Sequence, residues 1–371
     1  MVLDDRTRDF AAPLADLFAG AGLVRAEPAI LQSAELFLDL SGEDIRRRLL
    51  LVQSPDGSDR CLRPDYTIPV ACDFLAGGAR AGGYWYLGPV FRYRSGLGAV
   101  EIPQAGVERY GEADRAEADA AILALALETL AALGVSAPAV RIGDPGLMTA
   151  AINAFGLPAP WVKRLRRGFA RPGGIAAALD GEGGAPARGA RGRLVKALAG
   201  ADRGAAAAMV EELVGIAGIT AVGGRSAAEI ADRLLEQAVL AGDSSMNDTT
   251  RAMLKRFAAV SGSPAQALDD FAALTREAGI AIDEALEAFA ARSRALERVG
   301  ATLDFAASFG RRLDYYSGFV FEVHGEGSDA EAPLAGGGRY DGMLAALGAE
   351  GGIPAVGFTL WLDRVMGAAG R

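Results

Sequence analysis

The sequence predicts an α+β fold in which helices flank a mostly antiparallel sheet. Segments typical of strands fill both ends of the 371-residue chain, whereas a long middle stretch is typical of helices. Residues 84–110 consist of two alternating segments around a glycine-containing turn, which is the pattern of a β-hairpin. Residues 116–134 carry leucines at helical spacing, acidic residues at the start and Gly134 at the end, which predicts a helix.

The elements before and after the hairpin follow from the same patterns. Residues 1–40 predict a helix and then a short apolar segment. Residues 46–71 predict a strand, a turn at "PDGSD" and a second strand. Residues 137–146, "APAVRIGDPG", predict a buried strand and a turn.

The second half of the chain begins with helices and returns to strands. Residues 150–300 are rich in Ala, Arg and Glu with Gly and Pro breaks, which predicts a mostly helical region that fits an insertion within the core. Residues 301–309 and 313–327 predict strands. Residues 353–366 predict a strand that runs into a helix. The order of strands, helices and strands favours one core over residues 1–371.

Composition excludes several classes of function. A net charge of −9 argues against a nucleic-acid partner. Two cysteines and one histidine are too few for a disulfide framework or a Cys-based zinc site, so no metal is expected. The polar start "MVLDDRTRDF" lacks a signal-peptide pattern, and no uncharged apolar run is long enough to cross a bilayer. We therefore expect a cytoplasmic protein that stays off the membrane.

Polar side chains gather on one face of the predicted hairpin. Because residues i, i+2 and i+4 of a strand share a face, Gln104, Gly106 and Glu108 point to the same side. The small residue between the amide and the carboxylate predicts room for a bound molecule. On the other strand, Arg92 and Arg94 share a face. Guanidinium and carboxylate groups together suit a zwitterionic amino acid, and the alternative is a solvated polar face.

Two later segments add polar and glycine-rich positions. Arg311 precedes a predicted strand that begins with Tyr315 and Tyr316, so that at most one tyrosine lines a given pocket unless the strand twists. The alternative is two ordinary strand aromatics. The run "LAGGGRYDGM" lacks the pattern of a phosphate-binding loop, and predicts a tight turn before a strand.

Taken in order, six segments resemble histidyl-tRNA synthetase and its relatives. They are "LRPDYT", "GPVFRY", "QAGVERYG", "RRLDYYSGFVFEV", "GGGRYDGM" and "PAVGF". The resemblance implies a class II aminoacyl-tRNA synthetase-like core, with a six- or seven-stranded antiparallel sheet, that is usually dimeric. It also implies a histidine-binding pocket, formed here by Asp65, Thr67, Arg92, Gln104, Glu108, Arg311, Tyr315 and Tyr316.

This chain departs from the family where the family binds ATP. The turn after Arg92 lacks the usual arginines, with Arg94 in place of a glutamate and Val100 in place of an arginine. Trp361 replaces a glycine that lets the nucleotide approach the backbone. We therefore expect a nucleotide cleft that is filled by an indole and poor in cations. No cofactor is expected.

The chain ends at Arg371, where a histidyl-tRNA synthetase continues into an anticodon-binding domain, so we expect no such C-terminal domain. Retained amino-acid residues with a lost ATP site resemble the regulatory subunits of ATP phosphoribosyltransferase. That resemblance implies a non-catalytic chain that supports a short-form catalytic subunit in the first step of histidine biosynthesis. It also implies allosteric feedback by histidine within a hetero-octamer.

Two other interpretations remain open from the sequence. One is an active histidine-adenylating enzyme, against which Trp361 and the cation-poor turn argue. The other is a histidine-sensing module for a different partner.

Overall fold

A computed structural model of the chain describes residues 9–40, 45, 47–55, 57–94, 96–169, 174–180, 203–216, 227–241, 246–311, 315–326 and 332–369. The chain divides into two compact units. The larger unit comprises Met1–Leu147, Val260–Ala273 and Asp283–Arg371, and the smaller one Met148–Ala259 and Leu274–Ile282. The predicted bounds of the helical region, 150–300, stay a prediction of domain organisation.

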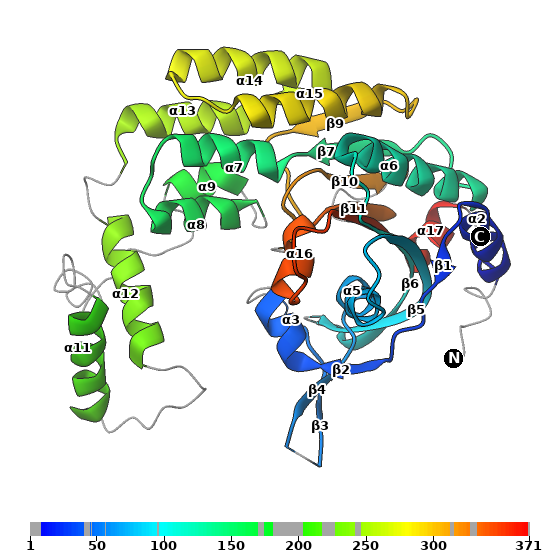
Figure 1. Ribbon diagram of the computed structural model, residues 1–371, viewed down its shortest axis with the longest axis horizontal. Coiled ribbons are helices and arrows are strands. Elements are labelled where there is room, and N and C mark those ends of the chain that lie inside the picture. The colour runs from blue at the N-terminus through cyan, green and yellow to red at the C-terminus, as the bar shows by residue number, and fades with distance from the viewer. Residues whose placement is uncertain are drawn as a thin grey trace. The chain divides into compact units, whose positions relative to one another are not determined.

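A large sheet forms the centre of the larger unit (Figure 1). In the described residues it has nine strands in the order β1-β5-β6-β12-β11-β10-β7-β9-β8, antiparallel except for β1–β5 and β7–β9. The strands are β1 Val24–Arg25, β5 Gly82–Arg94, β6 Gly98–Tyr110, β7 Ala139–Gly143, β8 Ser261–Gly262, β9 Leu303–Ala306, β10 Val320–His324, β11 Ala335–Arg339 and β12 Ala355–Trp361. The α+β class with a mostly antiparallel sheet is confirmed. Strands β1 and β8, two residues each, extend the predicted sheet at its edges.

The predicted hairpin is confirmed and forms the longest strand pair. Strands β5 and β6 have 13 residues each and pair from Gly82↔Tyr110 to Arg94↔Gly98. Gly96 and Gly98 take φ values of 83° and 78° at the turn, a conformation in which a side chain would be strained. The other edge of β6 pairs with β12, so that β6 lies inside the sheet.

Helices cover both faces of this sheet. Helix α5 (Thr67–Ala76) lies inside the curve of the sheet, while α2 (Ala11–Gly20), α6 (Arg115–Ala132) and α17 (Leu362–Ala368) lie on the other side (Figure 1). Helix α6 confirms the predicted helix. The Asp114 side chain caps its start by accepting from the Glu117 N–H at 3.1 Å, and Gly134 follows its end with φ 90°.

Helix α5 corrects the prediction of a second strand up to residue 71. The strand there, β4 (Asp59–Leu62), is short, and the chain turns into a helix at Thr67. Pro69 is compatible with this helix because it lies in the first turn, where the backbone N–H groups have no intrahelical partner. The apolar run that suggested a strand instead buries Ile68, Val70 and Phe74 against the sheet.

A second, small sheet precedes α5. Its order is β2-β4-β3, with β2 at Leu31–Ser33 and β3 at Leu51–Gln53. The predicted turn at "PDGSD" is confirmed: the Gly57 N–H donates to the Ser54 carbonyl at 3.0 Å, and Gly57 has φ 78°. Helix α3 (Ala34–Leu40), which follows β2, was not predicted.

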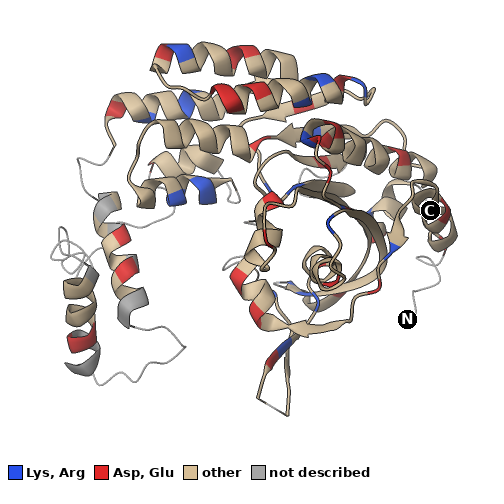
Figure 2. Cartoon of the chain, in the orientation of Figure 1, with Lys and Arg blue, Asp and Glu red and all other residues tan. Residues whose placement is uncertain are grey.

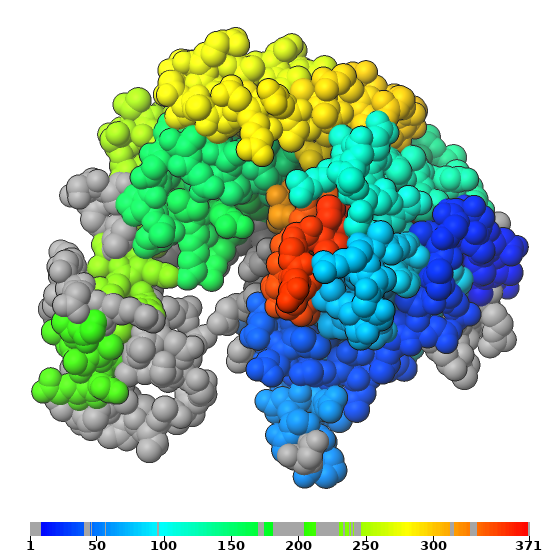
Figure 3. Space-filling model, viewed as in Figure 1, coloured from blue at the N-terminus to red at the C-terminus, as the bar shows by residue number. Residues whose placement is uncertain are grey.

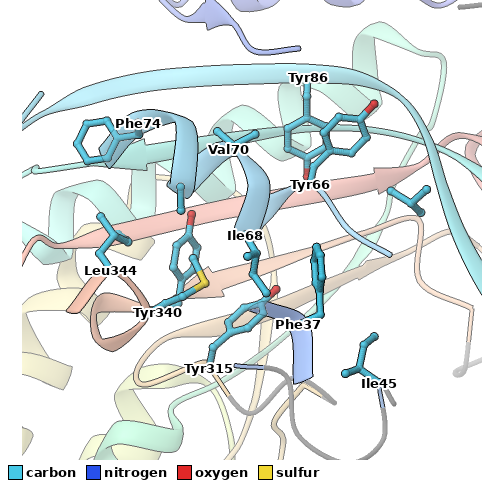
Figure 4. Packing of buried hydrophobic residues seen from close by; sticks show 14 of the residues in the cluster. Phe37, Ile45, Tyr66, Ile68, Val70, Phe74, Tyr86, Tyr315, Tyr340 and Leu344 are labelled. Carbon is cyan, nitrogen blue, oxygen red and sulfur yellow. The ribbon is translucent and has the colours of Figure 1, made fainter. Parts of the chain in front are cut away.

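The core of the larger unit lies between α5 and the sheet. Tyr66 and Tyr86 stack with ring centroids 4.2 Å apart, and Phe74 stacks on Tyr110 at 4.4 Å. Figure 4 shows the first pair beside Ile68 and Val70 of α5. Helix α16 (Asp341–Ala346) and α3 close the cluster, and Figure 3 shows α16, α5 and α3 adjacent on one face.

Two predictions near the C-terminus are wrong. The glycine run is not a turn but strand β11, which lies between β10 and β12. Glycine is required there because a Cβ at Gly337 would overlap the backbone of β12. The strand predicted over 313–327 is confirmed only for Val320–His324. Tyr315 and Tyr316 lie in an irregular segment before it, and residues 313 and 314 lie outside the described residues.

Buried ion pairs connect β11 to the outer helices. Arg339 contacts Asp119 of α6 at 2.7 Å. The other oxygen of Asp119 accepts from the Arg292 Nε at 2.7 Å, and Arg292 also binds Asp144. All four side chains are buried, so that each charge needs its partners. This network fixes the backbone on the N-terminal side of Tyr340, whose hydroxyl hydrogen-bonds the buried Glu108.

The remaining described elements are helices. They are α7 Pro145–Ala154, α8 Ala159–Gly168, α9 Gly174–Asp180, α11 Arg203–Ile216, α12 Ala227–Ala241, α13 Asp248–Ala259, α14 Pro264–Ala278 and α15 Asp283–Glu297. Acidic and basic residues mix on α14 and α15 (Figure 2). Among the described residues, no helix combines the length and apolarity that a membrane span requires.

Candidate functional site

A cavity of about 770 Å³ opens beside the β5–β6 hairpin in the larger unit. Its walls come from the hairpin, the start of α5, strand β12, the segment before β10 and the segment before β3. The cavity has the size of a small-molecule site. Seven of the eight predicted site residues line it, namely Asp65, Thr67, Arg92, Gln104, Arg311, Tyr315 and Tyr316.

Three of these side chains carry buried polar atoms without a hydrogen-bond partner. They are the Oδ2 of Asp65, both amide atoms of Gln104, and the Nε and Nη1 of Arg311. The exposed fractions are 5% for Asp65, 1% for Gln104 and 9% for the Arg311 side chain. Buried polar groups in folded proteins are almost always paired, so that unpartnered groups facing one cavity indicate a ligand.

The turn that carries Asp65 is held by a buried arginine that sequence reasoning missed. Arg63 donates from Nε to the Pro89 carbonyl at 3.0 Å and from Nη1 to the Pro28 carbonyl at 2.6 Å. Its guanidinium lies 4.0 Å from the ring centre of Tyr66. The Asp65 Oδ1 accepts from the Ile68 N–H at 3.3 Å, so that Oδ2 is left toward the cavity. Burial raises the pKa of the Asp65 carboxyl, and the charge of Arg92 opposes this shift.

Arg92 and Arg94 both line the cavity, as the strand period predicts. The Arg92 Nε donates to the Pro64 carbonyl at 2.7 Å, which directs the guanidinium toward Asp65. Gln104 projects from the facing strand, opposite Gly88 in the ladder. An arginine, a carboxylate and an amide thereby line the same cavity.

Glu108 occupies a different place from the one predicted. It is 1% exposed and lies behind the cavity wall. The Thr67 hydroxyl donates to its Oε1 at 2.8 Å, and the Tyr340 hydroxyl donates to its Oε2. Burial raises the pKa of the Glu108 carboxyl to about 8, although both hydrogen bonds act in the opposite direction. Glu108 therefore contacts a cavity residue, Thr67, and does not itself line the cavity.

The predicted gap at Gly106 is not a ligand space. A Cβ at Gly106 would overlap the hydroxyl of Tyr86 and the carbonyl of Phe358, so that protein atoms fill the position. The Tyr86 hydroxyl also hydrogen-bonds Thr359, a cavity residue, at 2.7 Å. Gly106 is thus required for packing. The strand period found the right face, but it could not show that a tyrosine covers it.

Tyr315 and Tyr316 both face the cavity because they lie in a loop rather than in a strand. Their ring centroids are 4.8 Å apart. Arg311 lies beside them, with its guanidinium 5.6 Å from the Tyr316 ring and 3.9 Å from the Glu322 carboxylate. A Cβ at Gly336 would overlap this guanidinium, which explains a second glycine of the β11 run.

Trp361 forms one wall of the cavity and is 8% exposed. Its ring lies 5.4 Å from the Arg311 guanidinium and 4.9 Å from that of Arg364. Cations at such distances from an indole are attracted to its ring. The indole therefore occupies space next to Arg311, and the filling of a nucleotide cleft by this indole stays a prediction.

The expectation of few cations around this cleft is wrong. Six arginines line the cavity: Arg47, Arg48, Arg92, Arg94, Arg311 and Arg364. Arg47 and Arg48 come from the segment before β3, which no sequence motif connected to the site. Thr359 and Glu322 were also missed, although Thr359 shares a strand face with Trp361 and so carried a signal.

Comparisons with known proteins identify the fold of this chain. A family model described as histidyl-tRNA synthetase matches residues 5–200 and 205–365. A solved structure from Bacillus halodurans C, an ATP phosphoribosyltransferase regulatory subunit/histidyl-tRNA synthetase, superposes with a TM-score of 0.65 at 21% identity over 98% of this chain and 79% of its own. Histidyl-tRNA synthetase from Nostoc sp. PCC 7120 gives 0.63 at 15% over 97% and 70%. The fold is that of a histidyl-tRNA synthetase-like class II protein.

Curated relatives narrow the class. The ATP phosphoribosyltransferase regulatory subunit of Mesorhizobium japonicum is 43% identical over 96% of both chains. That of Chelativorans sp. is 41% identical over the full length of both. The chain belongs to the family of ATP phosphoribosyltransferase regulatory subunits.

The raised pKa of Glu108 predicts a pH-dependent stability. Because the folded-state pKa of about 8 lies above the ordinary value of 4.5, the folded chain holds this proton more tightly than the unfolded chain. The contribution is present below pH 4.5 and is lost as the pH rises to 8. Relative to Glu108→Gln, the free energy of unfolding of the wild type should fall by roughly 3–5 kcal/mol over that range, at about 1.4 kcal/mol per pKa unit.

Urea unfolding of both proteins at pH 5 and pH 9 measures this difference. Parallel pH profiles for the wild type and Glu108→Gln would contradict the assignment of a buried, protonated carboxyl.

Proposed function

We propose that this chain is a non-catalytic regulatory subunit that binds free histidine in the cavity and acts on a short-form ATP phosphoribosyltransferase catalytic subunit. The observation that carries the proposal is the set of buried, unpartnered polar atoms on Asp65, Gln104 and Arg311. The names of the curated relatives supply the partner. The complex would act in the first step of histidine biosynthesis, in the cytoplasm.

The unpartnered groups match the parts of a zwitterionic amino acid. The Arg311 guanidinium suits a carboxylate, and the Asp65 carboxylate suits an ammonium group. The Gln104 amide can both donate and accept. An imidazole has a donor and an acceptor nitrogen, and it would lie near Thr67 and the two tyrosines. A ligand cation near Thr67 also favours the ionised form of Glu108, so that histidine binding releases a proton below about pH 8.

A regulatory rather than a catalytic role is supported by the cavity wall. Trp361 stands beside Arg311, next to the place where an amino-acid carboxylate would be activated. An indole there leaves little room for a nucleobase. We propose that the chain performs no adenylation, and that neither nucleic acid nor a metal takes part.

Histidine would regulate the catalytic subunit by binding two states of the assembly with different affinities. The proposed assembly is a hetero-octamer of four regulatory and four catalytic chains. A coupling of about 1–3 kcal/mol shifts the equilibrium between the two states roughly five- to 150-fold. Without such a difference in affinity, histidine would occupy the cavity and change nothing.

Removing one cavity group should weaken histidine binding. Gln104→Ala deletes an amide that the ligand is expected to satisfy, and it should raise the Kd at least tenfold, or about 1.4 kcal/mol. Asp65→Asn should also raise the Kd, because it removes the negative charge proposed to pair with the ammonium group of histidine. Isothermal titration calorimetry with histidine measures both. Glu101→Gln, an exposed position on the same strand, is the matched control.

If Gln104→Ala, Asp65→Asn and Glu101→Gln all bind histidine with the affinity of the wild type, histidine does not bind in this cavity.

Mixing the chain with a short-form catalytic subunit tests the function. The phosphoribosyltransferase rate should rise when the chain is added and fall again with histidine. With Gln104→Ala, the rise should remain, and the histidine concentration that lowers the rate should increase at least tenfold. If the phosphoribosyltransferase rate does not change when the chain is added, the chain acts on a different partner. Histidine-dependent ATP–pyrophosphate exchange by the chain alone would show an enzyme instead.

A further inference from the structure

The single histidine of the chain lies beside the candidate site. His324 is the last residue of β10, and it shares a strand face with Glu322, which lines the cavity. The His324 Nε2 lies 3.6 Å from the Glu322 Oε2, and the His324 side chain is 13% exposed. Its Nδ1 is buried and has no hydrogen-bond partner. Because a carboxylate accepts and cannot donate, the neutral imidazole is expected to carry its proton on Nε2, facing Glu322.

The Glu322 carboxylate lies between this imidazole and the guanidinium of Arg311. Its Oε1 is 3.9 Å from the Arg311 Nε, which is outside hydrogen-bond range. Glu322 faces Gly336 in the β10–β11 ladder, and a Cβ at Gly336 would overlap the Arg311 guanidinium. The missing side chain thus makes room for Arg311 next to Glu322. Among the described residues, Glu322 is the one carboxylate within ion-pair distance of Arg311.

Glu322 is shared among several positive groups. Arg141 stands opposite Glu322 in the β7–β10 ladder. Burial raises the pKa of the Glu322 carboxyl, but the interactions with His324, Arg311 and Arg141 outweigh burial and lower that pKa below its ordinary value. The charge of Glu322 also acts on Arg364 of α17. Glu322 is therefore ionised at neutral pH, and Arg311 is only one of the groups that attract it.

A carboxylate shared in this way leaves Arg311 available. The Nε and Nη1 of Arg311 are buried without a hydrogen-bond partner. Guanidinium–carboxylate hydrogen bonds have N–O distances of about 2.7–2.9 Å, so that a shift of Glu322 by roughly 1 Å would close an ion pair with Arg311. A closed pair would occupy the guanidinium that a ligand carboxylate needs. The contact of the other carboxylate oxygen with His324 opposes this shift.

We propose that His324 is a positioning residue of the ligand site, which holds Glu322 back from Arg311 and keeps the Arg311 guanidinium available for the carboxylate of the ligand. His324 does not itself line the cavity, so that it acts through Glu322. The inference rests on the proposed function for the role of Arg311. The position of Glu322 relative to Arg311, by contrast, does not depend on which ligand binds.

Calorimetry of the full chain with histidine and with histidine amide, which lacks the carboxylate, tests this role. His324→Leu should raise the Kd for histidine by about tenfold and leave the Kd for histidine amide within about twofold. His324→Gln keeps an N–H donor and should bind histidine like the wild type. Glu322→Gln in the His324→Leu background should restore histidine affinity, because the competing charge is gone. Glu326→Gln, which removes an exposed carboxylate from the same segment, is the matched control.

Three results of this titration overturn the proposal. They are equal histidine affinity of His324→Leu and the wild type, a loss that histidine amide shares, and a loss that Glu322→Gln does not reverse. His324→Phe, which also lacks the donor, serves if the leucine variant does not fold.

A crystal structure of ligand-free His324→Leu gives a second measurement. Glu322 should lie within hydrogen-bond distance of the Arg311 Nε, and a Glu322 carboxylate that keeps its wild-type separation from Arg311 contradicts the proposal. If the wild type binds neither histidine nor its amide, the proposed function fails, and this structure still decides the role of His324.

Discussion

The burial of Glu108 is the constraint on which the cavity depends. This carboxyl projects from β6, an inner strand of the sheet, and it accepts from Thr67 at the start of α5 and from Tyr340 directly after β11. Loss of either partner would leave a buried polar group unpaired, at a cost of about 1–3 kcal/mol. Gly357 must remain small because a Cβ there would overlap Glu108. Tyr340 is in turn placed by the ion pairs of Arg339, so that the position of Thr67 on the cavity wall depends on the core behind it.

Two kinds of polar group share the cavity, and their surroundings differ. Asp65, Gln104 and Arg311 each carry buried polar atoms without a hydrogen-bond partner, which suits a ligand that replaces water completely. Burial lowers the pKa of Arg92, the charge of Asp65 opposes this shift, and the half-buried Arg48 and Arg94 act in the same direction as burial. The Trp361 ring contacts two of the cavity arginines, Arg311 and Arg364. The proposed function therefore assigns to this cavity an amino-acid site beside an indole that leaves little room for a nucleobase.

The sequence predicts the fold best where a periodic pattern extends over many residues. The hairpin at 84–110 and the helix at 116–134 have enough residues for the pattern to be unambiguous, and the face shared by Gln104 and Glu108 follows from it. Short apolar runs do not distinguish a strand from a buried helix, and the run after Thr67 was wrongly predicted as a strand for this reason. The glycines of β11 suit a turn as well as a strand. The contacts that require them, with Arg311 and with the β12 backbone, are distant in sequence and leave no local signal. The placement of Arg48 beside Arg92 depends on one backbone hydrogen bond between remote segments, for which the sequence holds no signal.

The central claim is that the cavity beside the hairpin holds free histidine. A crystal structure of the chain grown with histidine tests it most directly. The account predicts histidine with its carboxylate on Arg311, its ammonium group on Asp65 and its imidazole toward Thr67, with the indole of Trp361 still in place. Histidine bound elsewhere, or a cavity that stays vacant at saturating histidine, would contradict the account.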